Sequence, residues 1–262
     1  MKMNSGDNFE YMKGTLPLIK CNELTFTHGF STREGGVSTD RDKISLDLGS
    51  TDGTDVTENR KRFASALSSD IGSMFFAKQI HSDRIERVTR ENIGQQFECD
   101  GFVTNEKGLL LTVKVADCVP ILLEDSNNTV IAAVHAGWRG TVKGIVLRAL
   151  EEMEKLGAKR ESIKAAIGPS IHSCCYEVDD PFVSAVKSSP CAESALKFIT
   201  PTADGKYRAS LQDMNYDLLS RFGVKNISVT SLCTCCNKDF FFSHRGLGAK
   251  RGLMMAGIII DG

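Results

Sequence analysis

The chain has 262 residues, which is enough for a substantial buried core, so its stability does not require a framework of disulfides. Hydrophobic residues make up 41% and charged residues 25% of it, as in an ordinary soluble globular protein. A net charge of −1 provides no electrostatic footprint for DNA or for an anionic membrane, so we expect neither as a partner.

The first strands and helices are predicted from apolar patterning and turn residues. Strands are expected at residues 25–31, 74–80, 109–115, 121–124 and 129–134, with a glycine-rich turn at 33–36 and a polar loop at 47–55. Asp55 with Glu58 resembles a capping pair for a helix whose apolar face comprises Val56, Phe63, Ala64 and Leu67. The pair Asn127-Asn128 predicts a hairpin.

The second half continues the mixture of strands and helices. An amphipathic helix is predicted over residues 142–156, closed by Gly157, and further strands over 163–167 and 226–231. Helices are expected at 181–187, with Asp180 as N-cap and Pro181 in the first position, and at 210–222. This order predicts an α/β or α+β layered fold with mixed sheets.

The chain is predicted to be a single cytoplasmic domain spanning residues 1–262. No repeat, low-complexity tract or Pro/Ser-rich linker divides it, and only 181–206 leaves room for a boundary. Its beginning, MKMNSGDNFEYMKG, lacks the features of a signal peptide, and its apolar runs are shorter than a membrane span. In a reducing compartment, nine cysteines are expected to be thiols, metal ligands or catalytic groups rather than disulfides.

Three residues stand out as candidates for chemistry. His81 and His135 lie at the ends of predicted strands, and Cys118 follows another strand in Ala-Asp-Cys-Val-Pro. Two imidazoles and one thiolate suit zinc and leave the fourth tetrahedral position for water or substrate. Spacing alone also allows core histidines with a buried thiol, or a Cys/His nucleophile pair.

A series of short motifs occurs in a characteristic order along nearly the whole chain. These are HGFSTR (28–33), GGVS (35–38), QIHS (79–82), ADCVP (116–120), HAGWRG (135–140), GPSI (168–171), CCYEV (174–178) and FFSHR (241–245). The set resembles the YfiH-like family, also called the multicopper polyphenol oxidoreductase (laccase) family, whose bacterial members are relatives of the laccase-domain purine nucleoside enzyme of animals.

This resemblance implies a four-layer α/β/β/α fold with two mixed sheets, related in architecture to the deamidase domain of cytotoxic necrotizing factor toxins. It implies zinc binding by His81, Cys118 and His135, which occupy the ligand positions of the Gln-x-His, Ala-Asp-Cys and His-Ala-Gly-Trp motifs. The implied activities are phosphorolysis of adenosine, inosine and methylthioadenosine, and deamination of adenosine. Purine nucleosides and phosphate are therefore the expected small-molecule partners.

Two segments depart from the family pattern. Residues 45–49 read SLDLG where relatives commonly have NLNLG, which leaves the role of that loop's side chains open. Residues 233–236 read CTCC and extend a shorter Cys-Thr motif. The extra cysteines suggest a second metal site, but the run lacks the partner pair of a structural zinc ribbon, and thiols are the alternative.

Substrate contacts are expected from basic side chains within the motifs. Guanidinium forks suit phosphate or ribose oxygens, and Arg33, Arg139 and Arg245 are the candidates. Their structural alternative is pairing with Asp100, Asp117 or Glu177. His244 is a candidate proton donor or substrate contact, whereas His28 and His172 are expected to be structural or exposed.

Aromatic stacking and further thiol chemistry are weaker candidates. Trp138, the only tryptophan, either stacks on a base or packs against the following helix. Cys174 and Cys175 are expected to have buried rather than catalytic roles.

Three mechanisms remain open at this point. A zinc enzyme would use metal-activated water for deamination and arginines to hold phosphate for phosphorolysis. A Cys/His hydrolase, such as an amidase acting on peptidoglycan precursors, would use Cys118 as nucleophile and His135 as base. A copper polyphenol oxidase requires about ten copper ligands, most of which are histidines. Because the chain has five histidines and no His-x-His pair, zinc is favoured over copper.

Overall fold

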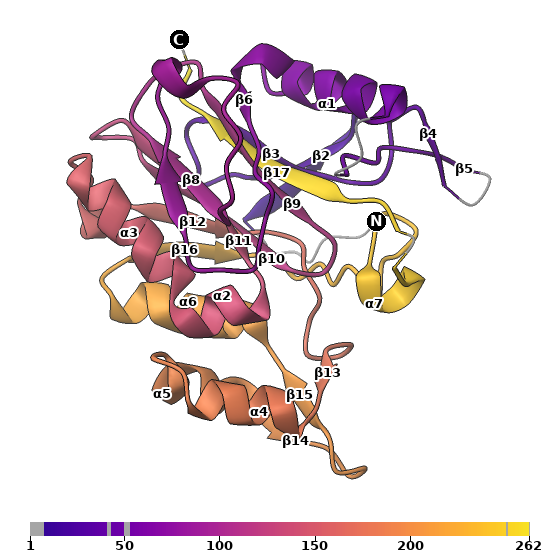
Figure 1. Ribbon diagram of the computed structural model, residues 1–262, viewed down its shortest axis with the longest axis vertical. Helices are drawn as coiled ribbons and strands as arrows, with labels where there is room; N and C mark the ends of the chain where they lie inside the picture. The colour runs from indigo at the N-terminus through magenta and orange to yellow at the C-terminus, as the bar shows by residue number, and fades with distance from the viewer. Residues whose placement is uncertain (1–7, 41–42, 50–52, 250, 262) are drawn as a thin grey trace.

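The computed structural model describes residues 8–40, 43–49, 53–249 and 251–261. Two six-stranded sheets lie face to face, and helices cover the outer face of each (Figure 1). The predicted four-layer fold with mixed sheets is therefore confirmed. The helices of the described residues are all too short or too polar to cross a membrane.

The first sheet is formed by both ends of the described chain and its middle. Its strands, in spatial order, are β1 (Phe9–Met12), β2 (Leu18–Cys21), β3 (Thr27–Ser31), β17 (Met254–Ile259), β9 (Leu110–Val115) and β6 (Met74–Phe75). All neighbours are antiparallel except β6 and β9. Helix α1 (Thr54–Ala66) covers the outer face.

The second sheet carries the segments that matter for function. Its order is β16 (Asn226–Val229), β12 (Lys164–Ile167), β10 (Val119–Asp125), β11 (Val130–Ala136), β8 (Gly101–Thr104) and β7 (Ile85–Arg87). The β10–β11 pair is the hairpin predicted around Asn127. Helices α2 (Trp138–Lys143), α3 (Ile145–Lys155) and α6 (Leu211–Arg221) cover its outer face.

Alternation along the strands explains the layers. In β9, Leu110 packs in the cluster beneath α1, whereas Leu111 belongs to the core between the sheets. In β10, Ile121 packs in the core beneath the helices, whereas Leu122 faces the first sheet. Because successive side chains point to opposite faces, strands buried on both sides are apolar at most positions.

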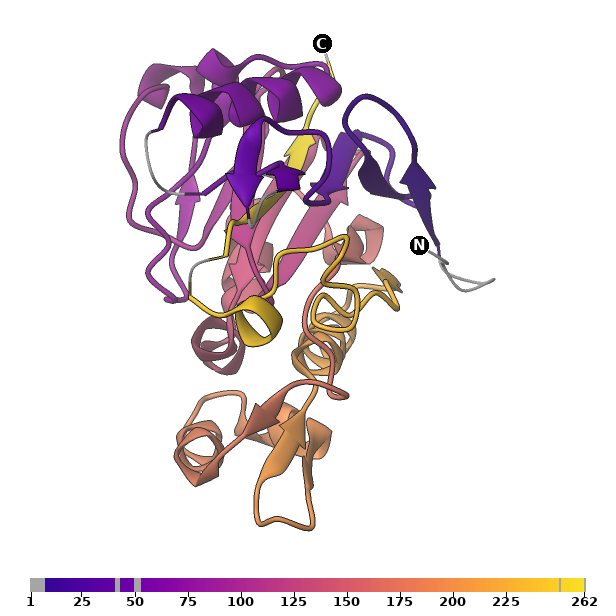
Figure 2. The ribbon, with the colours of Figure 1, turned by 90° about the vertical axis from the view of Figure 1, so that its right-hand side faces the viewer.

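Smaller elements extend from this frame. A three-stranded sheet of β13 (Glu177–Val178), β15 (Tyr207–Ala209) and β14 (Ile199–Pro201) lies beside α4 (Asp180–Lys187) and α5 (Ala192–Ala195) (Figure 2). A two-stranded sheet comprises β4 (Ser38–Asp40) and β5 (Lys43–Ser45), and α7 is His244–Leu247. Short 3-10 helices are Ile71–Ser73, Arg90–Asn92, Arg160–Ser162 and Leu196–Phe198. Phe182 of α4 shares one apolar cluster with Val134 of β11. The single domain stays a prediction.

Three predicted helix boundaries need correction. Gly53, not Asp55, is the N-cap of α1, and Asp55 lies in the first helical turn. Asp179 caps α4 by accepting a hydrogen bond from the Phe182 N–H, so the predicted cap Asp180 is the first helical residue. The helix predicted over 142–156 is two helices, because Gly144 has a φ of +83° and ends α2 in the left-handed conformation. Residues 50–52 of the predicted loop at 47–55 lie outside the described residues.

Candidate metal centre and adjoining cavity

His81, Cys118 and His135 come together beside strands β10 and β11 of the second sheet. One ligand atom from each lies within 4.8 Å of the others, and we call this group the three-ligand centre. Cys118 directly precedes β10, and His135 lies in β11 opposite Pro120. The His81 and His135 rings meet edge to face, with centroids 5.0 Å apart. The ring of His135 is buried, Cys118 is half-buried and His81 is exposed, so the centre is accessible from one side.

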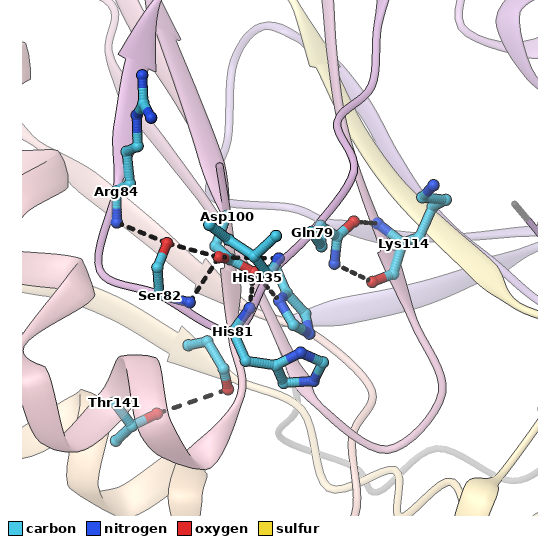
Figure 3. A network of polar contacts seen from close by, with 10 residues as sticks. Gln79, His81, Ser82, Arg84, Asp100, Lys114, His135 and Thr141 are labelled. Atoms are coloured by element: carbon cyan, nitrogen blue, oxygen red, sulfur yellow. Dashed lines mark hydrogen bonds and ion pairs between the residues drawn. The ribbon is translucent and has the colours of Figure 1, made fainter. Parts of the chain in front are cut away.

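Asp100 fixes the orientation of two of these residues (Figure 3). Its carboxylate accepts hydrogen bonds from the Ser82 N–H at 2.6 Å, the Ser82 hydroxyl at 2.7 Å and the His81 N–H at 3.0 Å. It also contacts Nδ1 of His135 at 2.9 Å. Burial alone would raise the pKa of Asp100, but the hydrogen bonds from His135 and Ser82 outweigh it and lower the pKa. An anionic Asp100 leaves Nε2 of His135 for the centre.

Gln79 explains how the chain reaches His81. The strand predicted over 74–80 is shorter than expected, because β6 ends at Phe75. Beyond it, the Gln79 side chain replaces a strand neighbour: its amide donates to the Lys114 carbonyl at 2.8 Å and accepts from the Lys114 N–H at 2.7 Å. The backbone then turns with a φ of +57° at His81. This left-handed conformation is costly for a non-glycine residue and is typical of functional sites.

Asp117, next to Cys118, has a second such conformation, with a φ of +87°. Its carboxylate accepts a hydrogen bond from the Thr234 hydroxyl at 2.6 Å and another from the Arg245 N–H at 2.7 Å. These contacts hold Cys118 against the segments that follow β16, and they offset the cost of the strained backbone.

Gly137 leaves room for the three-ligand centre. A Cβ atom added there would lie 3.0 Å from the His81 ring, 3.4 Å from the Cys118 sulfur and 3.5 Å from the His135 ring. A side chain at this point of the HAGWRG motif would crowd the His81 ring, so Gly137 belongs to the site although the sequence reasoning did not single it out.

The protonation of Cys118 and His135 is coupled. Enclosure alone would raise the pKa of the Cys118 thiol, but the charge of His135 more than offsets it and lowers the pKa to about 6. Burial alone would lower the pKa of His135, but the Cys118 thiolate and Asp100 raise it to about 9. Near neutral pH the metal-free pair is therefore a thiolate with an imidazolium.

A cavity of about 330 Å³ adjoins the three-ligand centre. This volume lies within the range of small-molecule sites. Of the predicted residues, His81, Cys118, Arg139, Arg245 and His244 line it, together with Trp138. The other lining residues are Ala116, Asp117, Ile171, Tyr176, Leu211 and Arg251.

The predicted arginines are distributed unequally around this cavity. The Arg245 guanidinium donates to the carbonyls of Cys175 at 3.1 Å and Glu177 at 2.9 Å, and that of Arg139 lies over the Trp138 ring at 4.3 Å. The residues lining the cavity do not include Arg33. Its guanidinium donates to the Lys238 carbonyl at 3.0 Å and lies over Phe242.

Arg251 and Tyr176 are cavity residues that the sequence reasoning missed. Nε of Arg251 is buried and has no hydrogen-bond partner within the described part of the chain. A buried donor of this kind favours an anionic or carbonyl acceptor from a ligand. Burial raises the pKa of Tyr176, so its phenol stays protonated and can donate a hydrogen bond. Tyr176 stands in the CCYEV motif, whereas no pattern in the sequence distinguishes Arg251.

A larger groove of about 710 Å³ lies beside the cavity. The two hollows share Trp138, Arg139, Tyr176 and Arg245. The groove continues along β13 and α4, where Asp179 and Phe182 line it. Trp138 packs on Phe182, with ring centroids 5.2 Å apart, so the tryptophan both packs and lines the opening.

Comparison with known sequences identifies the family. The family model described as multi-copper polyphenol oxidoreductase laccase matches residues 27–261. The chain belongs to this family. Purine nucleoside phosphorylase YlmD of Bacillus subtilis (strain 168) is 36% identical over 242 residues, covering 87% of this chain and 86% of that protein. Adenosine deaminase RL5, from an unknown prokaryotic organism, is 37% identical over 213 residues, covering 78% and 81%.

Solved structures of the family have the same fold. The Bacillus licheniformis hypothetical protein YfiH matches with a TM-score of 0.87 and 33% identity, covering 97% of this chain and 99% of that one. YlmD from Geobacillus stearothermophilus matches with a TM-score of 0.85 and 31% identity, covering 98% and 100%. The predicted family is thus confirmed, and its named relatives are nucleoside enzymes.

Proposed function

We propose that this protein is a zinc-dependent purine nucleoside enzyme that phosphorolyses adenosine, inosine and methylthioadenosine and also deaminates adenosine. The observation that carries the proposal is the position of the three-ligand centre, two of whose residues, His81 and Cys118, line a cavity together with arginines and aromatic residues. The names of the relatives, purine nucleoside phosphorylase and adenosine deaminase, agree with this chemistry.

His81, Cys118 and His135 fit a zinc ion better than copper. Two imidazoles and a thiolate are a usual zinc donor set, and their ligand atoms are close enough to share one ion. The lowered pKa of Cys118 favours the deprotonated form that binds metal. Zinc bound there would supply a Lewis acid and an activated water. With five histidines, the chain lacks the ligands of a multi-copper oxidase.

Phosphorolysis requires a positive surface for phosphate beside the ribose. We assign this role to Arg245 and Arg139, with Arg251 as an additional donor toward the cavity. The bond from C1′ of the ribose to the purine breaks as a phosphate oxygen bonds to C1′. His244, exposed at the cavity, is placed to give a proton to the departing base.

Base recognition is assigned to the aromatic wall. Trp138 and Tyr176 line the cavity, and stacking on an aromatic ring would tolerate both adenine and hypoxanthine. In deamination, water adds at the amino-bearing carbon of adenosine and ammonia leaves, giving inosine. The protonated Tyr176 phenol can donate a hydrogen bond to the substrate during either reaction.

The test is product analysis with protein of defined metal content. Adenosine is incubated with and without phosphate, and adenine, hypoxanthine, inosine and ribose 1-phosphate are separated by chromatography. We expect adenine and ribose 1-phosphate only with phosphate, inosine under both conditions, and loss of both reactions after chelation with recovery on zinc addition. Absence of all products from folded, zinc-loaded protein would refute the proposal.

The second candidate function is that of a Cys/His hydrolase, such as an amidase acting on peptidoglycan precursors. It is favoured by the coupled Cys118–His135 pair with Asp100 on the far side of the imidazole, an arrangement that also activates thiol nucleophiles. Chelation would then increase activity, and alkylation of Cys118 would abolish it. A substrate-derived adduct on Cys118, detected by mass spectrometry, would establish this mechanism over the zinc enzyme.

A further inference from the structure

Four cysteines that are distant in sequence meet at the surface beside the cavity. Cys174 and Cys175 lie in the turn before β13, and Cys233 and Cys236 lie in the turns after β16. An isolated parallel bridge between Ser170 and Cys233 aligns the two segments. We call this group the four-cysteine cluster, and it supplies the partner pair that the CTCC run lacks on its own.

The spacing of the sulfur atoms suits one metal ion. Sγ of Cys236 lies 3.6 Å from that of Cys174 and 3.4 Å from that of Cys175, and the last two are 3.8 Å apart. All four sulfurs, including that of Cys233, lie within 4.8 Å of one another. Zinc–sulfur bonds of about 2.3 Å in tetrahedral geometry place neighbouring sulfurs about 3.8 Å apart. All nine cysteines of the chain are free thiols, so no disulfide competes for these atoms.

We propose that Cys174, Cys175, Cys233 and Cys236 bind a single Zn²⁺ ion in a closed site made of four thiolates. Thiolates select zinc, copper(I) or iron–sulfur clusters. An iron–sulfur cluster would hold its cysteines further apart, because its own iron and sulfide atoms lie between them. Four protein ligands leave no position for water or substrate, so the ion has a structural role.

The surroundings stabilise the charge of such a site. Four thiolates around Zn²⁺ carry a net negative charge, and two guanidinium groups contact the backbone of the ligands. Arg208 donates to the Cys174 carbonyl at 3.3 Å, and Arg245 donates to the Cys175 carbonyl at 3.1 Å. The Cys233 sulfur also accepts the His172 N–H at 3.5 Å. Cys174 and Cys236 are exposed, which gives the ion a route into the cluster.

The proposed ion would fasten together two segments that shape the cavity. On one segment, Cys175 precedes Tyr176 and its carbonyl accepts from Arg245. On the other, Thr234 donates through its hydroxyl to Asp117. The zinc site itself does not depend on the proposed function, whereas its effect on nucleoside turnover does. Its cysteines are positioning residues, because the substrate cavity is lined by their neighbours and not by them.

The decisive experiment measures metal content and thiolate ligation separately from activity. We expect about two equivalents of zinc per wild-type chain and about one in Cys118→Ser/His135→Ala, in which only the four-cysteine cluster remains. Cobalt substituted into that variant should give the intense thiolate-to-metal absorption of a four-thiolate site. Cys174→Ser/Cys236→Ser should lose this absorption and about one equivalent of metal, whereas Cys235→Ser, a control in the same turn, should keep both.

Wild-type protein provides a check that does not depend on the folding of variants. Titration with a mercurial thiol reagent should release two zinc ions, one as Cys118 reacts and one as the four cysteines of the cluster react. Wild-type zinc content in Cys174→Ser/Cys236→Ser, or disulfides among these cysteines in freshly purified protein, would overturn the inference. Normal turnover without the cobalt signature would refute the cluster alone. The signature without any nucleoside turnover would refute only the proposed function.

Discussion

The three-ligand centre and the four-cysteine cluster differ in how the fold holds them. Cys118 and His135 of the first lie at the ends of adjacent buried strands, and Asp100, which directly precedes β8 of the same sheet, orients the histidine. The cluster lies on two turns joined by one isolated bridge and has exposed ligands. The rigid sheet therefore supports a centre that stays open to the cavity, whereas the turns bring together a set that a metal can close.

The composition of the two groups leads to the same distinction. Three mixed ligands leave a coordination position for chemistry, whereas four thiolates fill every position of a tetrahedral ion. Within the described residues, these are the two groups in which three or more ligand atoms meet. Proximity of ligands therefore does not by itself distinguish a catalytic metal site from a structural one. The distinguishing feature is an open coordination position that faces a cavity.

The largest effect is expected from removing a ligand of the three-ligand centre. Cys118→Ala or His135→Ala should lose about one equivalent of zinc and lower turnover of adenosine on the order of 10³-fold, because the Lewis acid supplies several kcal/mol. The four-cysteine cluster should keep its metal in both variants. Metal analysis with product assays checks this, and full zinc occupancy in both variants would show that the centre is misassigned.

A smaller loss is expected from Asp100→Asn. The amide retains the shape of the carboxylate but cannot provide the same anionic acceptor for His135 and Ser82, so zinc affinity should fall about 10- to 100-fold. Competition with a metal-binding dye measures this affinity. An unchanged zinc affinity would show that Asp100 does not support metal binding and has only a structural role.

Gly137→Ala tests the close packing around the ligands. The added methyl group would press on the His81 ring and touch Cys118 and His135, and displacement of His81 by a fraction of an ångström should lower turnover about tenfold. Gly53→Ala is the matched control, because a Cβ there meets nothing within 4 Å. If the two variants have the same activity as the wild type, the packing at Gly137 is not limiting for function.

The smallest effect is expected for Arg245→Lys. A lysine keeps the charge but loses the fork that binds the backbone and that we assign to phosphate, so the KM for phosphate should rise about threefold with the cluster's metal retained. Arg33→Lys should behave as the wild type, since Arg33 does not line the cavity. Phosphate titrations of both variants measure the difference. A larger rise in KM for Arg33→Lys than for Arg245→Lys would assign phosphate binding to Arg33 instead.

Most of the architecture could be predicted from the sequence because its central strands are largely apolar runs. Strands β9 to β12 lie close to their predicted positions, as does α6. The errors arise where a side chain or a backbone conformation replaces a regular element. The Gln79 amide pairs with Lys114 where a strand was expected, and Gly144 divides a helix whose apolar periodicity continues across it.

The site was only partly predictable for a related reason. The family motifs point to His81, Cys118 and His135, and the structure brings these residues together. Arg251 lies outside every motif, and its place at the cavity depends on the tertiary fold. Likewise, Cys174 and Cys233 are 59 residues apart, and only the Ser170–Cys233 bridge brings their turns together.

The position of β17 has a consequence for biosynthesis. This last strand lies between β3 and β9, so the first sheet consists of two separate halves until the C-terminal segment has been translated. Each half then exposes a strand edge that is open to pairing with other chains. The sheet can close only after β17 has left the ribosome, and a nascent chain lacking β17 is an expected client for chaperones.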